Sequence, residues 1–406
     1  MKRGRVVWCP EGTNMQRPKI TFWRVVLVLI LLVGAYATVL RFARGLGATT
    51  NLSDAFPWGL WVGFDVMCGV MLAAGGFTLT AAVYILNLRE FKPIIRPTIL
   101  TAFLGYSLVV VALLFDLGRG YRIWHPLVMW NPRSVMFEVA WCVTLYSTVL
   151  ALEFSSVVFE RLHFPRLIRL QKMIVIPLVI AGVMLSTLHQ SSLGSLYLIV
   201  PNKLYPLWYT PLLPVLFFLS ALCVGLAMTI FESSMSARHF GKQLEMPLLR
   251  QLGRALLVAL AVYTVVRFQD LLHRGALHLL QWRSPETPLF VLEMLLCSVA
   301  PICLLLIPKV RKNADGLYLS SVLCLLGFVT NRLNIAITGM ERYAGQQYFP
   351  KWTEVSITLA IIASGFLVFA LAVKYLPIFD RVASQQPVAE PETAGGKLPE
   401  LSNVES

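Results

Sequence analysis

The chain has 406 residues, of which 57% are hydrophobic and only 14% are charged. Soluble domains carry roughly 25% charged residues, so a soluble fold of this length would lack polar surface, and the disordered, collagen-like and disulfide-framework classes are excluded too. The composition therefore predicts an integral membrane protein. Its formal net charge is +14, from 35 Lys and Arg against 21 Asp and Glu.

Ten segments are long and apolar enough to cross a bilayer, since a spanning helix needs about 20 mostly apolar residues. Lipid requires backbone hydrogen bonds to close within each span, and these runs are longer than barrel strands and do not alternate. The predicted fold class is an all-α polytopic membrane protein. The ten expected helices are 21–42, 58–86, 98–117, 134–158, 171–188, 208–231, 252–273, 287–308, 317–338 and 353–376.

Basic residues are unevenly distributed between the two sides of these helices. Of the 35 Lys and Arg, 23 lie in or beside the N-terminus, the even-numbered loops and the C-terminus, 10 lie on the other side, and Arg267 and Arg332 lie within spans. The positive-inside rule then places both termini of this multi-pass protein in the cytoplasm. If the protein is bacterial, its expected location is the inner membrane, with the other side facing the periplasm. The net charge reflects topology and anionic lipid headgroups, and nucleic-acid binding is not expected.

The two ends of the chain are expected to lie outside the membrane domain of residues 21–380. Residues 1–20 are expected to form a cytoplasmic segment before an uncleaved first helix, because no A-x-A-like cleavage site follows. Residues 381–406 are rich in Pro, Glu and Ser, and this composition predicts a disordered cytoplasmic tail.

The chain has seven cysteines, and six of them lie inside spans. An iron–sulfur cluster uses closely spaced thiolates in a loop, and a structural zinc site uses Cys/His pairs. Neither pattern is present, so no metal site is predicted and the cysteines are expected to be small apolar core residues. Any iron–sulfur cluster would belong to a partner chain.

The middle of the chain repeats a pattern of polar residues. An Arg is followed 20 residues later by an Asp, then by Arg-Gly, a Trp–Pro stretch and a span with one buried acid. The two copies begin at Arg96 and Arg250 and end at Glu138 and Glu293. The match is either a coincidence or a parallel repeat, which would give two four-helix bundles, about 58–188 and 208–338, with the first and last helices flanking them.

Ionisable residues within spans are functional candidates because they are expensive to bury, and here they gather toward the periplasmic side. Asp65 and Glu138 have no evident partner of opposite charge, which suits proton exchange. The remaining members are either structural ion pairs, such as Arg267–Asp270 at i,i+3 and Asp116–Arg119 at the end of a helix, or parts of a proton path. They are Asp116, Arg119, Arg267, Asp270, Glu293 and Arg332, whereas the cytoplasmic half holds chiefly Glu153 and Glu232.

Two further residues are suited to binding a ligand. His189 ends the fifth span in a Ser-rich turn, HQSSLGS, and a histidine can change charge near neutral pH. Tyr106 lies in the middle of the third span, where a buried hydroxyl needs a partner such as a ligand carbonyl. The periplasmic loops add Trp58, Trp124 and His125, which form either an interfacial aromatic belt or a contact for an amphipathic ligand or partner protein.

Four segments resemble the NrfD/PsrC family of quinone-interacting membrane subunits. Within that family they are most similar to the HybB-type membrane subunits of periplasmic nickel–iron hydrogenase 2, and the resemblance spans about 20–380. The segments are PWGLWVGFD (57–65), LTAFLGYSLVVVALLFDLGR (100–119), NPRSVMFEVAWCVTLYSTVLALEF (131–154) and LHQSSLGSL (188–196).

The resemblance implies a site for menaquinone or ubiquinone near the periplasmic face. Tyr106, Glu138 and His189 match the family's candidate quinone and proton residues, and Asp65 is a further acidic position. The implied partners are a ferredoxin-like iron–sulfur subunit and the large and small subunits of a nickel–iron hydrogenase. The chain would pass their electrons to quinone, with coupled proton translocation as a further expectation.

Other functions remain open from the sequence. A b-type cytochrome subunit with one haem is one of them, although none of the six histidines is mid-span, which disfavours a two-haem bundle. The partner could instead be a molybdopterin complex of the polysulfide-reductase type. A secondary transporter fits a repeat with buried charges but needs a midplane site, and a passive anchor needs only one or two helices.

Overall fold

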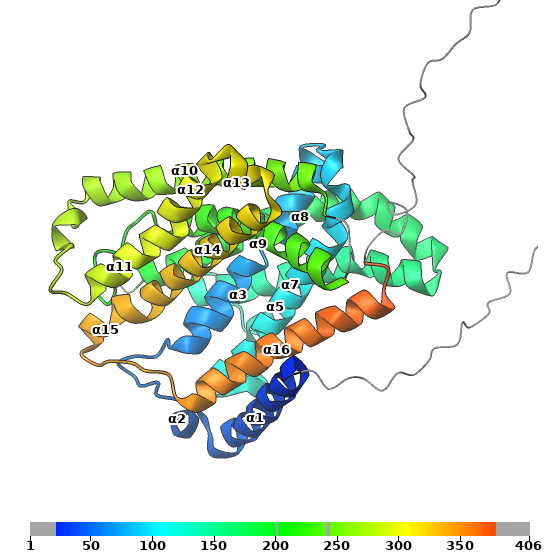
Figure 1. Ribbon diagram of the computed structural model, residues 1–406. Helices are drawn as coiled ribbons and strands as arrows, with labels where there is room; N and C mark the ends of the chain where they lie inside the picture. Colours follow the sequence, from blue (N-terminus) through cyan, green and yellow to red (C-terminus); the bar gives the residue numbers. More distant parts are fainter. Residues whose placement is uncertain (1–21, 200–201, 241–243, 379–406) are drawn as a thin grey trace, which may run out of the picture.

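The computed structural model describes residues 22–199, 202–240 and 244–378. Across these residues the chain is helical with connecting turns, and it contains no β-strand (Figure 1). Ten helical segments are long and apolar enough to cross a membrane, which confirms the predicted all-α polytopic class. The segments expected at 1–20 and 381–406 lie outside the described residues.

Each expected span corresponds to one helical segment, some of them interrupted by π-helical turns. The first five are formed by α1 (Phe22–Arg44); η1 (Trp61–Val66), α3 (Met67–Leu72), α4 (Gly75–Thr80) and η2 (Ala81–Ile85); η3 (Arg89–Phe91) and α5 (Lys92–Asp116); α7 (Val135–Leu162); and α8 (Pro165–Leu198). The last five are formed by α9 (Leu213–Phe240); α10 (Met246–His273); α11 (Glu286–Met294), η6 (Leu295–Val299) and α12 (Ala300–Leu306); α14 (Ala314–Leu333), η7 (Asn334–Thr338) and α15 (Gly339–Ala344); and α16 (Trp352–Tyr375).

Short helices lie in the connections between these spans. They are α2 (Leu46–Thr49), η4 (Gly120–Arg122), α6 (His125–Val128), η5 (Ala276–Leu279) and α13 (Pro308–Lys312). We call the side of the loops 86–88, 163–164 and 307–313 the basic side, and the side of the loops 45–60, 117–134 and 345–351 the opposite side. The two sides follow from the alternating direction of ten successive spans.

Helix α8 differs most from its expected span of 171–188. It runs for 34 residues, about 51 Å at 1.5 Å per residue, so it exceeds the roughly 30 Å hydrocarbon core of a bilayer. The Ser-rich turn predicted after Leu188 is wrong, because α8 continues through it. The hydroxyls of Ser191 and Ser192 donate to Thr187 O and Leu188 O at 3.0 and 2.8 Å, and such back-bonding lets serine stay within an apolar helix.

The spans pack in two groups of four helices joined through α9. The segment η1–η2 packs with α5, and α5 with α7, while α7 packs with α8. Helix α9 contacts α8, α3 and α4 of this first group as well as α10 and α14 of the second. Figure 1 shows α9 between the two groups. The parallel relationship between the groups stays a prediction.

The first and last spans form a separate pair on the first group. Helices α1 and α16 pack against each other, and α16 also contacts α5 and η1, as seen along one edge of Figure 1. Many apolar side chains of α1 are exposed, including Val28, Leu32 and Val39 at 52%, 62% and 65%. Lipid tails are apolar, so such exposure is the normal condition of a membrane-facing surface.

The interior of the protein contains polar residues as well as apolar ones. Arg267, Arg332 and Tyr106 are among the largest fully buried side chains. Five of the six described cysteines are buried as expected, whereas Cys303 is exposed. The buried polar residues mark the regions where a functional site can lie, because polar groups inside a membrane protein need partners.

Candidate functional site

Tyr106 and His189 meet in the interior of the first group of helices. The Tyr106 hydroxyl lies 3.0 Å from Nδ1 of His189, and both side chains are completely buried. The tautomer of the imidazole decides which of the two groups donates the hydrogen. Nε2 of His189 has no hydrogen-bond partner among the residues that the structure describes. The structure thus brings together two predicted residues that are 83 positions apart.

Buried polar atoms without partners gather around this pair. The ring of Tyr146 packs edge-on against Tyr106, with centroids 4.6 Å apart. Among the described residues, Tyr146 Oη, Ser186 Oγ, His189 Nε2 and Gln190 Oε1 are buried without a partner, and Ser147 Oγ and Tyr197 Oη are further unpartnered atoms elsewhere on α7 and α8. A buried polar atom costs free energy unless water or a ligand bonds it. We call Tyr106, Tyr146, Ser186, His189 and Gln190 the tyrosine–histidine site.

Three members of this site, Tyr146, Ser186 and Gln190, were not predicted from the sequence. Ser186 lies three positions before the predicted His189 on α8 and Gln190 one position after it, and all of them are buried. The prediction ended the fifth span at residue 188 and placed the polar residues that follow in a turn. Their helical spacing was therefore not recognised. The signal that could have found them is the helical spacing of polar side chains, which also includes Tyr197.

Glu138 lies outside the tyrosine–histidine site. It is in the first turn of α7, and its side chain is exposed, so the prediction of a buried acid is wrong. The Ser192 hydroxyl donates to its carboxylate, and Ser192 follows His189 by three residues on α8. A carboxylate near a helix N-terminus is favoured by the helix dipole, which explains this position without burial.

Asp65 belongs to a different cluster, near the opposite side. It is buried within η1 and accepts a hydrogen bond from Thr358 Oγ1 of α16 at 2.8 Å. Asp116 lies at the end of α5 within electrostatic range of Asp65, Arg41 and Glu354. We call Asp65, Asp116 and Glu354 the outer carboxylate cluster. Among the described residues, no hydrogen bond joins Asp65 to Tyr106, Glu138 or His189.

The buried cation beside the outer carboxylate cluster is Arg41, and not Arg119. Arg41 is buried, and its guanidinium donates to Phe115 O and Leu117 O, both at 2.9 Å, so it satisfies carbonyls at the end of α5. Arg119 is exposed, and the ion pairs of the described residues do not include Asp116. The predicted Asp116–Arg119 pair is therefore wrong.

Glu354 is completely buried and fully hydrogen-bonded. Its carboxylate accepts from the backbone N–H groups of Asn51 and Lys351 at 2.8 and 3.1 Å and from the Tyr348 hydroxyl. Burial, together with this carboxylate, raises the pKa of Tyr348 well above its usual range. The phenol therefore remains a donor at physiological pH, and the loop before α16 is tied to the cluster.

In the second group of helices, Asp270 pairs with Arg274 and not with Arg267. The guanidinium of Arg274 contacts both carboxylate oxygens at 2.7 and 3.1 Å, and the Thr210 hydroxyl donates at 2.6 Å. Arg267 instead donates to Leu207 O at 2.9 Å, and its Nε has no partner. The predicted i,i+3 pair is wrong. The carboxylate of Asp270 is bound instead by Arg274, the i,i+4 residue at the end of α10.

Glu293 and Arg332 belong to one buried network. Glu293 accepts from Trp208 Nε1, Asn331 Nδ2 and Asn334 Nδ2 at 2.8, 2.7 and 2.9 Å. Arg332 donates to Asn331 Oδ1 and Ser220 Oγ at 2.8 and 2.6 Å. We call Glu293, Asn331, Arg332 and Asn334 the second-group network. Its two predicted residues are connected through Asn331 rather than by direct contact.

The predicted loop aromatics lie on the opposite side of the molecule. Trp58 is half-buried, and its ring packs edge-on against Tyr197 at 5.3 Å, so it covers the end of α8 that leads to His189. Trp124 is 50% exposed and contacts the ring of His125 at 4.4 Å. Trp58 is therefore a neighbour of the site, whereas Trp124 and His125 form part of the surface.

Comparisons with known proteins agree with this architecture. The sequence model of the family described as "Polysulphide reductase, NrfD" matches residues 48–344. A protein of Nitratidesulfovibrio vulgaris is 38% identical, over 91% of this chain and 97% of its own length. The probable Ni/Fe-hydrogenase 2 b-type cytochrome subunit of Escherichia coli K12 is 33% identical, over 90% and 93%. The menaquinone reductase integral membrane subunit of N. vulgaris is 30% identical, over 92% and 96%.

The ten apolar helices define a multi-pass integral membrane protein with polar residues buried between its spans. The chain belongs to the NrfD family, because the family match covers most of the chain and a hydrogenase-2 subunit exceeds 30% identity. This confirms the resemblance read from residues 57–65, 100–119, 131–154 and 188–196. Helices α1 and α16 lie outside the matched range.

Proposed function

We propose that this chain is the quinone-reactive membrane subunit of a respiratory hydrogenase complex of the bacterial inner membrane. The observation that carries the proposal is the buried Tyr106–His189 hydrogen bond with unpartnered polar atoms around it. Hydrogenase 2 and menaquinone reductase appear in the names of two relatives that match the chain over most of its length, which supports both the partner and the substrate.

The tyrosine–histidine site offers the chemistry that quinone reduction needs. A quinone takes up two electrons and two protons, and each of its carbonyl oxygens becomes a hydroxyl. The electrons come from the iron–sulfur clusters of a peripheral partner subunit. The tautomer of His189 decides which group offers a proton: Nε2–H is the free donor when Tyr106 donates to Nδ1, and the Tyr106 hydroxyl is the free donor when Nδ1 carries the hydrogen. Either donor can bond a carbonyl oxygen and deliver a proton to it. Oxidation of quinol by the reverse steps would drive hydrogen formation.

The surface on the opposite side of the molecule is suited to binding a partner subunit. The loop after α5 exposes Tyr121, Trp124 and Trp130 at 71%, 50% and 64%, together with Arg119 and Arg122. Exposed aromatic and Arg side chains are enriched at protein interfaces. We place the iron–sulfur subunit on this face, which is the periplasmic one if the basic side faces the cytoplasm.

Protons can reach the tyrosine–histidine site from the basic side through α7 and α8. A Cβ atom at Gly182 would lie 3.7 Å from the Tyr146 ring and 3.8 Å from the Glu153 carboxylate. Tyr146 and Glu153 therefore face the same point of α8, with Glu153 nearer the basic side. We propose that Glu153 passes protons toward Tyr146 and Tyr106, which would couple quinone reduction to proton uptake from the cytoplasm.

The histidines do not fit a haem held between two imidazoles. All six lie among the described residues, and four of them are exposed, while His125 is half-exposed. His189 alone is buried, and its Nδ1 is bonded to Tyr106. Axial ligation of haem by two histidines needs two imidazoles that face each other. We therefore assign the redox chemistry of this chain to bound quinone.

A molybdopterin enzyme is the second candidate partner, because the matching family is described by polysulphide reductase. The complex should be purified through an affinity tag on this chain and its subunits identified by mass spectrometry. A nickel–iron large subunit is the expected result. A molybdopterin subunit would overturn the hydrogenase assignment and leave the quinone site itself unaffected.

Substitution at the tyrosine–histidine site tests the quinone assignment. In Tyr106→Phe and His189→Gln, hydrogen-dependent reduction of a menaquinone analogue should fall about 100-fold, the usual scale for losing a proton-transfer group. Reduction of benzyl viologen should persist, because this dye takes electrons from the peripheral subunits. Tyr36→Phe, on the lipid-facing surface of α1, is the matched control. Wild-type quinone reduction in an assembled Tyr106→Phe complex would overturn the proposal.

A further inference from the structure

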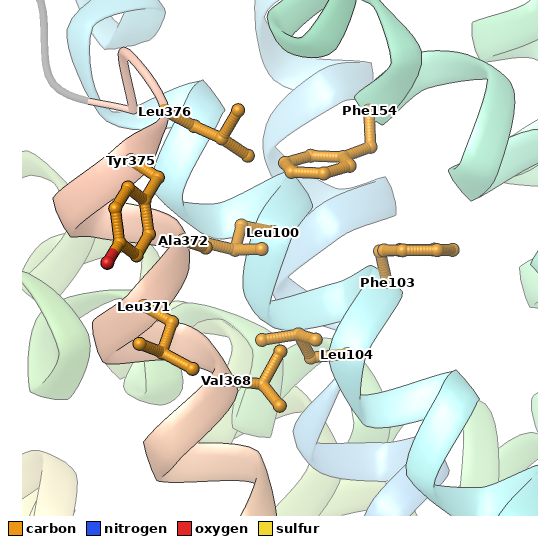
Figure 2. A pocket seen from close by; sticks show the side chains of 9 residues that line it. All are labelled: Leu100, Phe103, Leu104, Phe154, Val368, Leu371, Ala372, Tyr375 and Leu376. Carbon is orange, nitrogen blue, oxygen red and sulfur yellow. The ribbon is translucent and has the colours of Figure 1, made fainter.

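An apolar groove opens between α5, α7 and α16 toward the basic side. Its volume is about 310 Å³. Figure 2 shows the nine side chains that line it, with the hydroxyl of Tyr375 directed away from the others. The lining residues are Leu100, Phe103, Leu104, Phe154, Val368, Leu371, Ala372, Tyr375 and Leu376.

The groove has rigid walls and offers no polar group to a ligand. Phe103 and Phe154 stack with centroids 5.5 Å apart and planes 16° apart, which fixes one wall. Leu371 and Tyr375 on the α16 wall are 44% and 60% exposed, so the groove opens toward the lipid. A polar ligand would lose its hydrogen bonds there, whereas a hydrocarbon chain would lose none.

The basic end of the groove carries Lys374, a cation without an ion-pair partner among the described residues. Lys374 immediately precedes the lining residue Tyr375, is exposed, and places its ammonium 5.3 Å from the centroid of that ring. Across the part of the chain that the structure describes, no carboxylate lies within ion-pair distance of Lys374. On the α5 wall, Arg96 lies one turn before Leu100 and donates to Pro377 O at 3.1 Å.

We propose that this groove binds an anionic phospholipid, with an acyl chain along the apolar walls and the phosphate at Lys374. Lysine near a membrane surface attracts anionic headgroups, and its apolar stem can lie along the helix while the charge reaches the headgroup region. The C-terminal residues 379–406 are a poor alternative occupant, because their sequence is rich in Pro, Glu and Ser.

The proposal is independent of the quinone assignment. Five of the nine lining residues belong to α16 or follow it, and the family match ends at residue 344. The lipid would fasten α16 to α5 and α7 on the basic side. On the opposite side, the same helix is held by Thr358 and Glu354.

Native mass spectrometry of the purified complex tests the proposal, with dioleoyl phosphatidylglycerol and dioleoyl phosphatidylcholine as the two probes. The wild type should retain phosphatidylglycerol preferentially. Ala372→Phe should fill the groove and abolish this tight binding, and Leu371→Trp provides a second blocking variant if the first folds poorly. Lys374→Gln should weaken phosphatidylglycerol about fivefold, the effect of one basic residue, and leave phosphatidylcholine unchanged.

Two matched variants control for general effects on lipid binding. Lys309→Gln removes a lysine of α13 on the same side, and Leu319→Trp enlarges an exposed residue of α14; neither should change the preference. Equal binding of the two lipids by the wild type would overturn the proposal, as would unchanged binding in both blocking variants. Displacement of the lipid by a menaquinone, with no effect of Lys374→Gln, would assign the groove to an isoprenoid tail instead.

Discussion

Two of the buried polar regions differ in how completely their hydrogen bonds are made. In the second-group network, Glu293 accepts from three side-chain donors and Arg332 has acceptors in Asn331 and Ser220. In the tyrosine–histidine site, by contrast, Nε2 of His189 and the hydroxyl of Tyr146 lack partners. A saturated network stabilises one arrangement of helices, whereas an unsaturated one has capacity for a substrate or water.

Glu153 provides a prediction at the scale of single residues. Glu153→Gln preserves the size of the side chain and removes its ability to carry a proton. In proteoliposomes, quinone reduction by this variant should slow at least tenfold, and the number of protons taken up from the basic side per quinone reduced should fall. A pH-sensitive dye trapped inside the liposomes reports the uptake.

The control for this prediction is Glu160→Gln. Glu160 lies two turns beyond Glu153 on α7 and is paired with Arg96 at the surface, so its loss should leave both quantities unchanged. If the slow Glu153→Gln enzyme still takes up the normal number of protons from the basic side per quinone reduced, Glu153 acts on stability or binding and not on proton delivery.

At the scale of helices, close backbone contacts position the buried residues. In the second group, α14 crosses η6 at Gly327, where a Cβ atom would lie 2.1 Å from the backbone nitrogen of Cys297. Helices in membranes associate through such small residues because lipid provides no hydrophobic driving force between them. The same helix carries Asn331 and Arg332 one turn later, so this crossing sets their distance from Glu293.

Gly327→Ala should therefore separate α14 from η6. Overpacking of this kind costs about 1–3 kcal/mol or more, because the neighbouring atoms are backbone and cannot rotate away. The thermal midpoint of the purified protein in detergent should fall clearly, as measured by size-exclusion chromatography after heating. Gly47→Ala, with nothing within 4 Å of its added atom, should leave the midpoint unchanged. Equal midpoints for the two variants would contradict the described crossing.

At the scale of the whole molecule, α1 and α16 complete the outer carboxylate cluster. The segment η1 supplies Asp65 and α5 supplies Asp116, whereas α1 contributes Arg41 and α16 contributes Glu354 and Thr358. These two flanking helices lie outside the range matched by the family. The first group of helices is therefore flanked by two helices that the family model does not match.

The distribution of basic residues predicts the orientation of the whole protein. Green fluorescent protein fused after Ser406 should fluoresce, because the positive-inside rule keeps the basic side in the cytoplasm. Alkaline phosphatase inserted after Gly345, in the loop between α15 and α16, should be active, since this enzyme needs the periplasm to form its disulfides. If the green fluorescent protein fusion is dark and the alkaline phosphatase is inactive, the topology is inverted and the proposed partner lies on the other side.

The sequence by itself determined the class and the number of spans. Apolar runs of about 20 residues can only be helices in lipid, so all ten spans could be located from the hydropathy of successive segments. Their ends were less certain: α8 extends ten residues beyond its expected end, because serine hydroxyls bond back to their own helix and do not terminate it. Local patterns also located Tyr106 and His189 as candidates.

Only the tertiary structure decided which residues meet. Sequence spacing paired Arg267 with Asp270 and Asp116 with Arg119, but Arg274 binds Asp270 and Arg119 is exposed. The partners of Asp65 and His189 come from helices 293 and 83 residues away. Hydrogen bonds depend on distance and direction in space, and in a helical membrane protein these are fixed by how the spans pack, which their individual sequences do not specify.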